Sequence, residues 1–236
     1  MRARVSPVKP ITFYPVNLNL AGRKCVVVGG GKVAERKVRS LLSASADVIV
    51  VSPKVTRGID SLSKRGRISL KKVRYDRRSI RGAWVVIAAT DDAALNEKVA
   101  ADAARSCALV NAVDLPEACT FIVPAVLRRG SLSICISTDG QSPLLARVLK
   151  ERCSECIGQE YAALVRALGA ARRTAKVRAA ESRVRTSLYE SLIRSPLLDL
   201  LRNGKEKEAR ELVRETIDRY TLRIAAPCVP STGGCK

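Results

Sequence analysis

The chain has 236 residues, of which 47% are apolar, and it carries a formal net charge of +21 without a single histidine. This is enough apolar material for one large domain, or for a domain with a smaller appendage. No stretch approaches the roughly 18 uninterrupted apolar residues of a membrane helix, and residues 1–15 lack the apolar core of a signal peptide, so we expect a cytoplasmic protein. Without histidine, acid–base chemistry falls to Asp, Glu, Lys, Tyr or Cys.

The positive charge raises the possibility of nucleic-acid binding, because basic patches neutralise phosphates. Its distribution is uneven: residues 57–81 hold ten Lys or Arg with two acids, whereas residues 82–149 hold five with seven. Aromatic residues are 3% of the chain, so stacking platforms for single strands are scarce. An acidic substrate or simple solubility explains the excess equally well.

The eight cysteines are dispersed through apolar runs, which favours reduced core residues over a disulfide framework. Cys153 and Cys156 form a CxxC pair. Together with Cys228 and Cys235 they would provide the four thiolate ligands of a structural zinc site. The first pair falls in a helical pattern and the second is seven residues apart. We therefore predict no metal site.

Residues 1–115 alternate β-branched runs with amphipathic helical patterns, at Val33–Leu42 and Ala93–Ala104, which is typical of a parallel sheet with crossover helices. We predict an α/β fold with a Rossmann-type parallel sheet. The expected strands are Lys24–Val28, Val48–Val51, Ile68–Val73, Trp84–Ala88 and Ala108–Val110.

The pattern then changes to a small β segment, residues 116–142, followed by a helical domain, residues 143–226. Thr120–Leu127 and Leu132–Ser137 read as a hairpin joined by residues 128–131. Residues 227–236 are expected to be a disordered tail. Interruptions of the helical pattern are expected at Gly158, the Gly169 region, Ser195-Pro196 and Asn203-Gly204. Apolar stripes such as Leu188, Leu192, Leu197 and Leu201 could serve a dimer or pack within one chain.

A G-x-G-x-x-A fingerprint stands between the first strand and the first helix, at residues 29–34, which is the context of a dinucleotide site. Gly29 permits the tight turn, Gly31 lets the backbone approach a pyrophosphate, and Ala34 allows close packing of helix on sheet. The helix N-terminus offers unpaired amides to the phosphates. Gly30, Lys32 and Val33 complete the predicted cofactor site.

The second strand ends in Ser52-Pro53-Lys54, without the acid that usually holds the adenosine ribose in NAD sites. Ser52 could bond a ribose hydroxyl and Lys54 could favour a 2′-phosphate, so the residues leave NAD and NADP open. Thr90, after the fourth strand, can reach the cofactor. Asp91 and Asp92 are interpreted as caps of the next helix.

Four blocks in register resemble the precorrin-2 dehydrogenase and sirohydrochlorin ferrochelatase family, the N-terminal part of siroheme synthases. They are YPVNLNLAGRKCVVVGGGKVAERK, VVIAATDDAALN, NAVDLPEACTFIVPA and STDGQSPLLAR, and the resemblance covers about residues 12–152. It implies NAD-dependent oxidation of precorrin-2 to sirohydrochlorin in siroheme biosynthesis. It also implies a homodimer, in which residues 116–142 and the helical domain form the dimer and the substrate cleft.

The resemblance places cofactor contacts at Lys32, Val33, Pro53 and Lys54, and an essential carboxylate at Asp114. The chemistry agrees, because hydride loss requires loss of a proton, and a buried carboxylate beside the cofactor would accept it. The local sequence alone favours a turn-capping Asp114, and the family match reverses that preference. Asn111 could orient the nicotinamide amide.

Arginine and lysine side chains would pair with the substrate's carboxylates. For each of the candidate arginines and lysines named below, the alternative is a solvated surface role. Thr138 is a further candidate substrate residue, because many family members carry a serine at this position. The candidates are Arg128, Arg129, Arg147, Arg172, Arg173, Lys176 and Thr138.

We expect dehydrogenase activity as the main activity. Ferrochelatase activity, the insertion of iron into sirohydrochlorin, is a possible second activity that the sequence does not decide. Two other classes stay as alternatives: a non-catalytic Rossmann module that senses dinucleotides, which would not need Asp114, and a basic nucleic-acid-binding protein. The second would require tight binding with a steep salt dependence.

Overall fold

The structure is a computed structural model that describes residues 12–178 and 182–225. It divides into two compact units. The first reaches to Val123 and includes Asp139–Gln141, and the second consists of Pro124–Thr138 and the chain from Ser142 onward. Each unit is described by itself.

The first unit is built on a five-stranded parallel sheet with the order β3-β2-β1-β4-β5. This arrangement confirms the predicted Rossmann-type fold, in which the strand order reverses between β1 and β4. The strands are β1 (Lys24–Val28), β2 (Asp47–Val51), β3 (Ser69–Lys71), β4 (Val85–Ala88) and β5 (Leu109–Ala112).

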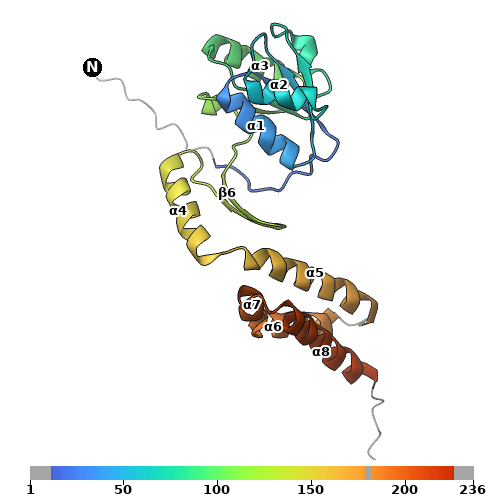
Figure 1. The fold of residues 1–236 in the computed structure, drawn as a ribbon. Coiled ribbons are helices and arrows are strands. Elements are labelled where there is room, and N and C mark those ends of the chain that lie inside the picture. Colours follow the sequence, from blue (N-terminus) through green and yellow to red (C-terminus); the bar gives the residue numbers. More distant parts are fainter. Residues whose placement is uncertain (1–11, 179–181, 226–236) are drawn as a thin grey trace, which may run out of the picture. The chain divides into compact units, whose positions relative to one another are not determined.

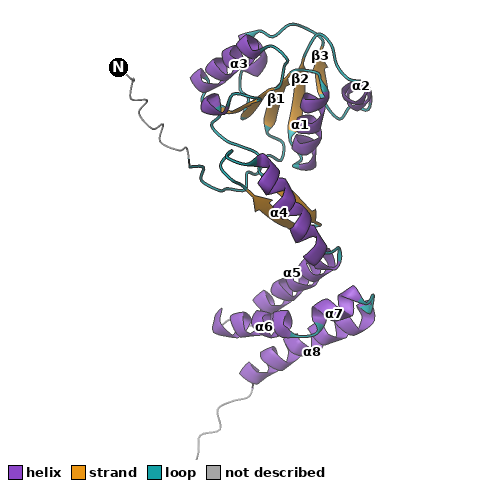
Figure 2. Ribbon diagram, turned by 90° about the vertical axis from the view of Figure 1, so that its left-hand side faces the viewer, coloured by secondary structure: helices purple, strands orange, loops and turns teal. Residues whose placement is uncertain are grey.

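Helices cover both faces of this sheet, so alternate residues of a strand enter two different cores (Figures 1 and 2). Val27 packs with α1 (Lys32–Ser43) and α2 (Arg57–Lys64), while Val28 packs with α3 (Ala93–Arg105). Because both faces are buried, the strands are continuous apolar runs, which is why the sequence revealed them.

The region between β2 and β4 differs from the prediction. Helix α2 was missed, since Ile59 is its only fully buried residue and the surrounding sequence is strongly basic. Strand β3 spans Ser69–Lys71 rather than Ile68–Val73, because this edge strand pairs with β2 alone and buries little. Strand β5 begins one residue later and ends two residues later than expected.

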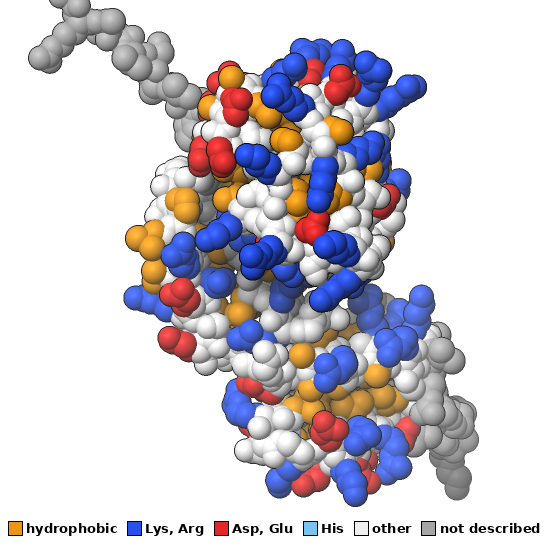
Figure 3. Space-filling view, turned by 45° about the horizontal axis from the view of Figure 1, so that its top comes forward, with side chains coloured by type: hydrophobic (Ala, Val, Ile, Leu, Met, Phe, Trp, Pro, Cys, Tyr) orange, Lys and Arg blue, Asp and Glu red, His pale blue; other side chains and the backbone are white. Residues whose placement is uncertain are grey.

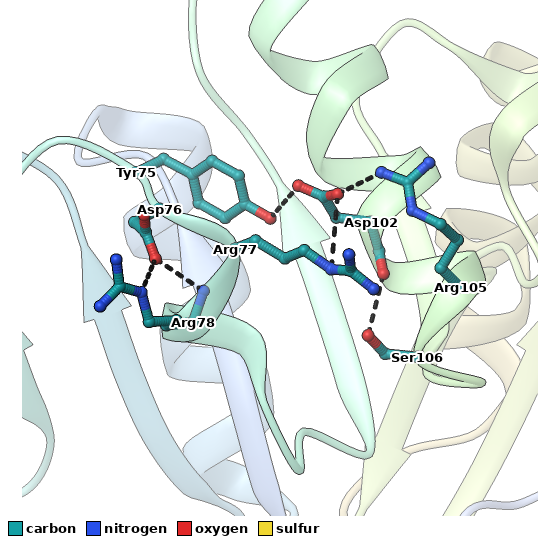
Figure 4. A network of polar contacts seen from close by, with 7 residues as sticks. All are labelled: Tyr75, Asp76, Arg77, Arg78, Asp102, Arg105 and Ser106. Atoms are coloured by element: carbon teal, nitrogen blue, oxygen red, sulfur yellow. Dashed lines mark hydrogen bonds and ion pairs between the residues drawn. The ribbon is translucent and has the colours of Figure 1, made fainter.

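A buried carboxylate fixes the connection between β3 and β4 to α3 (Figure 4). Asp102 of α3 is almost fully buried and accepts hydrogen bonds from the Tyr75 hydroxyl and from Arg105, with Arg77 of the short helix η1 (Arg77–Ile80) 3.9 Å away. Burial by itself would raise the pKa of Asp102, but the bonds from Arg105 and Tyr75 outweigh it and the pKa is lowered.

The second unit begins with an antiparallel hairpin of β6 (Ala125–Arg129) and β7 (Leu132–Ile136). The predicted hairpin is confirmed, but its first strand was placed at Thr120–Leu127. Thr120 instead bonds to Val110 of β5 through its backbone and hydroxyl, at 2.9 and 2.8 Å. The turn between the two strands comprises only Gly130 and Ser131, rather than the predicted residues 128–131. Gly130 has a φ of +58°, a conformation that favours glycine.

In the described part of this unit, five helices follow: α4 (Pro143–Cys156), α5 (Glu160–Arg178), α6 (Ser182–Arg194), α7 (Leu197–Arg202) and α8 (Glu206–Ala225). The expected breaks at Gly158, Ser195-Pro196 and Asn203-Gly204 are confirmed. The break near Gly169 was wrong, since this residue lies inside α5, where a glycine costs only about 1 kcal/mol relative to alanine. Leu188 and Leu192 form this unit's core with Ile217, and Leu197 is also buried, so these leucines pack within the chain.

None of the helices in the described ranges is both long and apolar enough to cross a membrane. Figure 3 shows Lys and Arg side chains spread over both units on the face drawn, with Asp and Glu among them. The charge excess on this face is therefore distributed rather than gathered in one stripe.

Candidate functional site

A cavity of about 390 Å³ lies at the carboxyl ends of the strands, where the chain leaves β1, β4 and β5. In open parallel sheets this edge, near the point where the strand order reverses, is where ligands bind. Its lining comes from three loops that are far apart in the sequence. The lining residues are Gly31, Lys32, Val33, Ala89, Thr90, Asp91, Ala93, Asn96, Val113, Asp114 and Leu115.

The glycine turn after β1 fits only because two of its glycines lack a side chain. A Cβ on Gly29, which has a φ of +126°, would lie 2.1 Å from the carbonyl oxygen of Ala89. A Cβ on Gly30 would lie 1.9 Å from the carbonyl oxygen of Lys54. Gly31 differs, because a Cβ there would meet nothing within 4 Å, and the space beside it belongs to the cavity.

Helix α1 begins at this turn with Gly31 as its N-cap, and no side chain caps it. The first-turn N–H groups therefore lack a side-chain partner and, with the helix dipole, suit an anionic ligand. Ala34 is fully buried, so the helix packs closely on the sheet, as predicted. Together with the exposed Lys32 and Val33 at the cavity wall, the turn fits the pyrophosphate of a dinucleotide.

The loop after β4 supplies a second part of the cavity lining. The Thr90 hydroxyl donates to Asn96 Oδ1 at 2.8 Å, and the Asn96 amide donates back to the Thr90 carbonyl at 3.0 Å. Asp92 caps α3 by accepting from the Leu95 N–H at 3.0 Å, as predicted. Asp91 does not cap the helix but lines the cavity, so its predicted capping role was wrong.

Asp114 lies in the same cavity, two residues after the end of β5. Its backbone has a φ of +58°, a conformation in which non-glycine residues are uncommon. Its side chain is exposed, which corrects the expectation of a buried carboxylate. The structure therefore brings an accessible carboxylate into the lining of the cavity that the glycine turn also lines.

A thiol holds the turn that carries Asp114. Cys119 Sγ accepts from the Ala112 N–H at 3.2 Å and lies 3.3 Å from the carbonyl oxygens of Ala112 and Leu115, to which it can donate. These contacts close the loop on both sides of Asp114. This role of Cys119 was not predicted from the sequence, although the cysteine stands five residues after Asp114.

Asn111 does not line the cavity. Its Oδ1 accepts from the Lys37 ammonium at 2.8 Å, and its amide donates to the Phe121 carbonyl at 3.2 Å. Burial, and then the nearby Arg36, lower the pKa of Lys37. Lys37 was also missed, although it stands four residues from both Val33 and Leu41, in line with apolar positions of α1.

The residues after β2 lie apart from this cavity. Ser52 is buried, and its hydroxyl donates to the Lys54 carbonyl at 2.6 Å. Pro53 and Lys54 line a second cavity, of about 780 Å³. Thr56, which lines the same cavity, is linked to the glycine turn, because its N–H donates to the Gly30 carbonyl at 2.9 Å.

The predicted substrate residues belong to the second unit. Arg128 and Arg147 are exposed, and Thr138 Oγ1 accepts from the Ser142 N–H at 3.0 Å. Arg129 instead bonds to the Ile157 carbonyl at 2.8 Å, at the end of α4.

The helical candidates Arg172, Arg173 and Lys176 are also exposed. Arg172 and Lys176 line a groove of about 950 Å³ along α5 and α6, whereas Arg173 does not.

Within the described ranges no cluster of Cys, Asp and Glu could hold a metal ion. Cys228 and Cys235, two members of the zinc site considered from the sequence, lie outside those ranges, as does the tail at 227–236. The six described cysteines are free thiols.

Comparisons with known proteins agree with this geometry. Residues 16–125 match the model of an NAD(P)-binding family, and residues 129–152 match that of the sirohaem biosynthesis protein central family. The chain is 34% identical over 206 residues to the siroheme synthase of Nitrosococcus oceani, and 37% identical over 205 residues to that of Chromobacterium violaceum. Both alignments cover 87% of this chain and 44% of the relative.

The fold is similar to the solved structure of SirC, a precorrin-2 dehydrogenase, with a TM-score of 0.74 and 27% identity. That similarity covers 88% of this chain and all of the solved chain. The chain thus spans less than half of the siroheme synthases it matches but the full length of a shorter relative. The cofactor is a nicotinamide dinucleotide, NAD, and the chain is similar to a precorrin-2 dehydrogenase and to part of the siroheme synthases.

Proposed function

We propose that this chain oxidises precorrin-2 to sirohydrochlorin in siroheme biosynthesis, with NAD as the hydride acceptor. The observation that carries the proposal is that Asp114 and the glycine turn line one cavity, although 83 residues separate Asp114 from Gly31. A proton acceptor and a pyrophosphate-binding turn in one cavity are what a dinucleotide-dependent dehydrogenation needs.

In this mechanism the N-terminus of α1 would hold the pyrophosphate, and Gly31 would permit its close approach. The exposed Val33 offers an apolar part of the cavity lining, and Thr90 contributes to the same lining. When bound, NAD supplies the hydride acceptor. The Asp114 carboxylate takes the proton that the substrate loses, and its exposed position lets the proton pass on to solvent.

For the substrate, we propose that Arg128, Arg147 and Thr138 bind acetate and propionate groups of precorrin-2. The guanidinium groups of both arginines are accessible in the second unit, and such groups bind carboxylates bidentately. Arg172 and Lys176 are a second set, supported by the groove that they line.

We further propose that the protein is a homodimer in the cytoplasm. The exposed Leu144 and Leu145 at the start of α4, at 66% and 48%, support an interface near residues 116–142 and the helices. The free thiols support a reducing compartment. Sedimentation over a range of concentrations tests the dimer, and a monomer throughout would contradict it.

The test of function is anaerobic turnover of enzymatically prepared precorrin-2, followed by the absorbance of sirohydrochlorin. We expect product with the native chain and a rate at least about 100-fold lower with Asp114→Asn. Glu117→Gln is the matched control, because it removes an exposed acid three residues away that does not line the cavity. Dinucleotide binding should persist in both variants.

Unchanged turnover in Asp114→Asn would remove this carboxylate from the mechanism. Dinucleotide binding without any turnover in the native chain would instead favour the non-catalytic sensing module. The nucleic-acid alternative predicts tight binding near physiological salt, which a salt titration with duplex DNA and RNA measures.

A further inference from the structure

A lysine of α1 makes a contact that the proposed mechanism does not yet use. Lys37 is half-buried, does not line the cavity, and donates from its ammonium group to Asn111 Oδ1 at 2.8 Å. Within the described ranges no Asp or Glu forms an ion pair with it. An ammonium group removed from water without a carboxylate costs free energy that an apolar side chain would avoid. A gain in stability therefore does not explain the lysine.

Lys37 determines the direction of the Asn111 side chain. Asn111 is buried in β5, and the oxygen and the NH2 group of its amide have almost the same shape. With the oxygen toward Lys37, the NH2 group donates to the Phe121 carbonyl at 3.2 Å and lies 3.6 Å from Cys119 Sγ. A flipped amide would place its oxygen against the Phe121 carbonyl and its NH2 group against the ammonium. Because an ammonium group only donates hydrogen bonds, Lys37 excludes that orientation.

The Asn111 amide belongs to a set of bonds that close the loop carrying Asp114. Residues 119, 120 and 121 bond back to residues 112, 110 and 111 of β5, respectively. Residues 113–118 thus form a loop whose two ends are fixed side by side. Asp114 lies in this loop with a φ of +58°, which a non-glycine residue keeps only where its surroundings fix it. The position of the exposed carboxylate therefore depends on the base of the loop.

We propose that Lys37 is a positioning residue for the Asp114 carboxylate, acting through Asn111 and the base of the loop at 113–118. The inference rests on the proposed function, in which Asp114 takes the proton, and it adds a residue outside the cavity to that mechanism. A residue that only stabilised the fold would affect stability and turnover together. A positioning residue affects the loop and the turnover while stability and the use of NAD stay the same.

The first experiment compares the native chain with Lys37→Met, in which the side chain nearly keeps its length but loses its charge and its donors. We expect kcat for precorrin-2 oxidation to fall about tenfold, with the KM for NAD within about twofold of the native value. The midpoint of chemical denaturation should not fall, because the cost of burying the ammonium is lost together with its bond. Lys37→Arg, which keeps a side chain that only donates, should retain most of the native kcat.

Arg36→Met is the matched control. It removes the exposed charge of the neighbouring residue in α1, which points to a different side of the helix, and kcat should not change. Equal falls of kcat in Arg36→Met and Lys37→Met would overturn the proposal. It would also be overturned if Lys37→Arg were no better than Lys37→Met, or if kcat fell only together with the denaturation midpoint.

Hydrogen exchange measured by mass spectrometry tests the loop without any turnover. Peptides that cover residues 112–121 should exchange faster in Lys37→Met, whereas peptides that cover β1 and the glycine turn should exchange as in the native chain. Cys119→Ala completes a double-mutant cycle. Since both residues hold the same loop, the double variant should lose little more turnover than the more impaired single variant.

Unchanged exchange at residues 112–121 in Lys37→Met would overturn the positioning role. Losses of kcat that multiply in the double variant would do so too, because Lys37 and Cys119 would then act independently. Faster exchange in Lys37→Met, with no precorrin-2 oxidation by the native chain, would support the control of the loop by Lys37 and contradict only the proposed reaction.

Discussion

Two turns at the carboxyl edge of one sheet form the candidate site, and they are held in different ways. The turn after β1 is fixed by backbone contacts so close that Gly29 and Gly30 cannot carry a side chain. The turn after β5 is fixed by side chains, chiefly the Cys119 thiol and the Lys37–Asn111 bond. The first should tolerate no side chain at Gly29 or Gly30, whereas the second should tolerate any side chain that can make the same bonds.

The largest effect is expected from Gly30→Ala. A Cβ at 1.9 Å from the Lys54 carbonyl forces the two loops apart, so we expect a loss of more than about 3 kcal/mol of unfolding free energy together with dinucleotide binding. Chemical denaturation and calorimetry measure the two effects. A stable Gly30→Ala variant would show that the turn is less tightly packed than described.

Gly31→Ala is the matched control for that prediction. Its Cβ meets no protein atom within 4 Å, so stability should change by less than about 1 kcal/mol. The new methyl group stands at the cavity, and dinucleotide binding should still weaken. Normal binding by this variant would argue against close approach of the pyrophosphate at Gly31.

A smaller loss of stability is expected from replacing Asp102, whose side chain is buried and holds its neighbours by hydrogen bonds. Asp102→Asn weakens the bonds from Tyr75 and Arg105 and should cost about 1–3 kcal/mol. Because the pKa of Asp102 is lowered on folding, its contribution should be complete above the unfolded pKa of about 3.9. It should then fade as the pH falls through the lower folded-state pKa.

Denaturation of the native chain and of Asp102→Asn at several pH values tests this. The difference between their unfolding free energies should be constant near neutral pH and should shrink below about pH 4. Asp76→Asn, an exposed acid in the same region, is the control and should alter stability only slightly. A difference that grows at acidic pH would contradict the assignment.

Apart from the control variants, the smallest change in stability, about 1 kcal/mol, is expected from Cys119→Ala. Because its thiol closes the turn around Asp114, we expect turnover to fall about tenfold while the NAD dissociation constant stays the same. Cys119→Ser, which can repeat the bonds, should recover most of the rate. Equal losses in both variants would mean that the thiol only fills space.

Periodicity alone located β1, β2 and β4, because strands buried on both faces are continuous apolar runs. The fingerprint at residues 29–34 located the dinucleotide turn, because only glycine satisfies its backbone. The resemblance to a family, rather than local sequence, selected Asp114 as the candidate carboxylate.

By itself, the sequence determined the α/β fold class, the glycine turn and most helix boundaries, since these depend on local conformation and on burial that repeats along the chain. Tertiary structure alone decided that Asp114 is exposed, that the Ser52 hydroxyl bonds to the Lys54 carbonyl, and that Lys37 and Cys119 bond to β5 and to the turn after it. Such contacts join residues far apart in the chain, and no local pattern records which distant partner a polar side chain will meet.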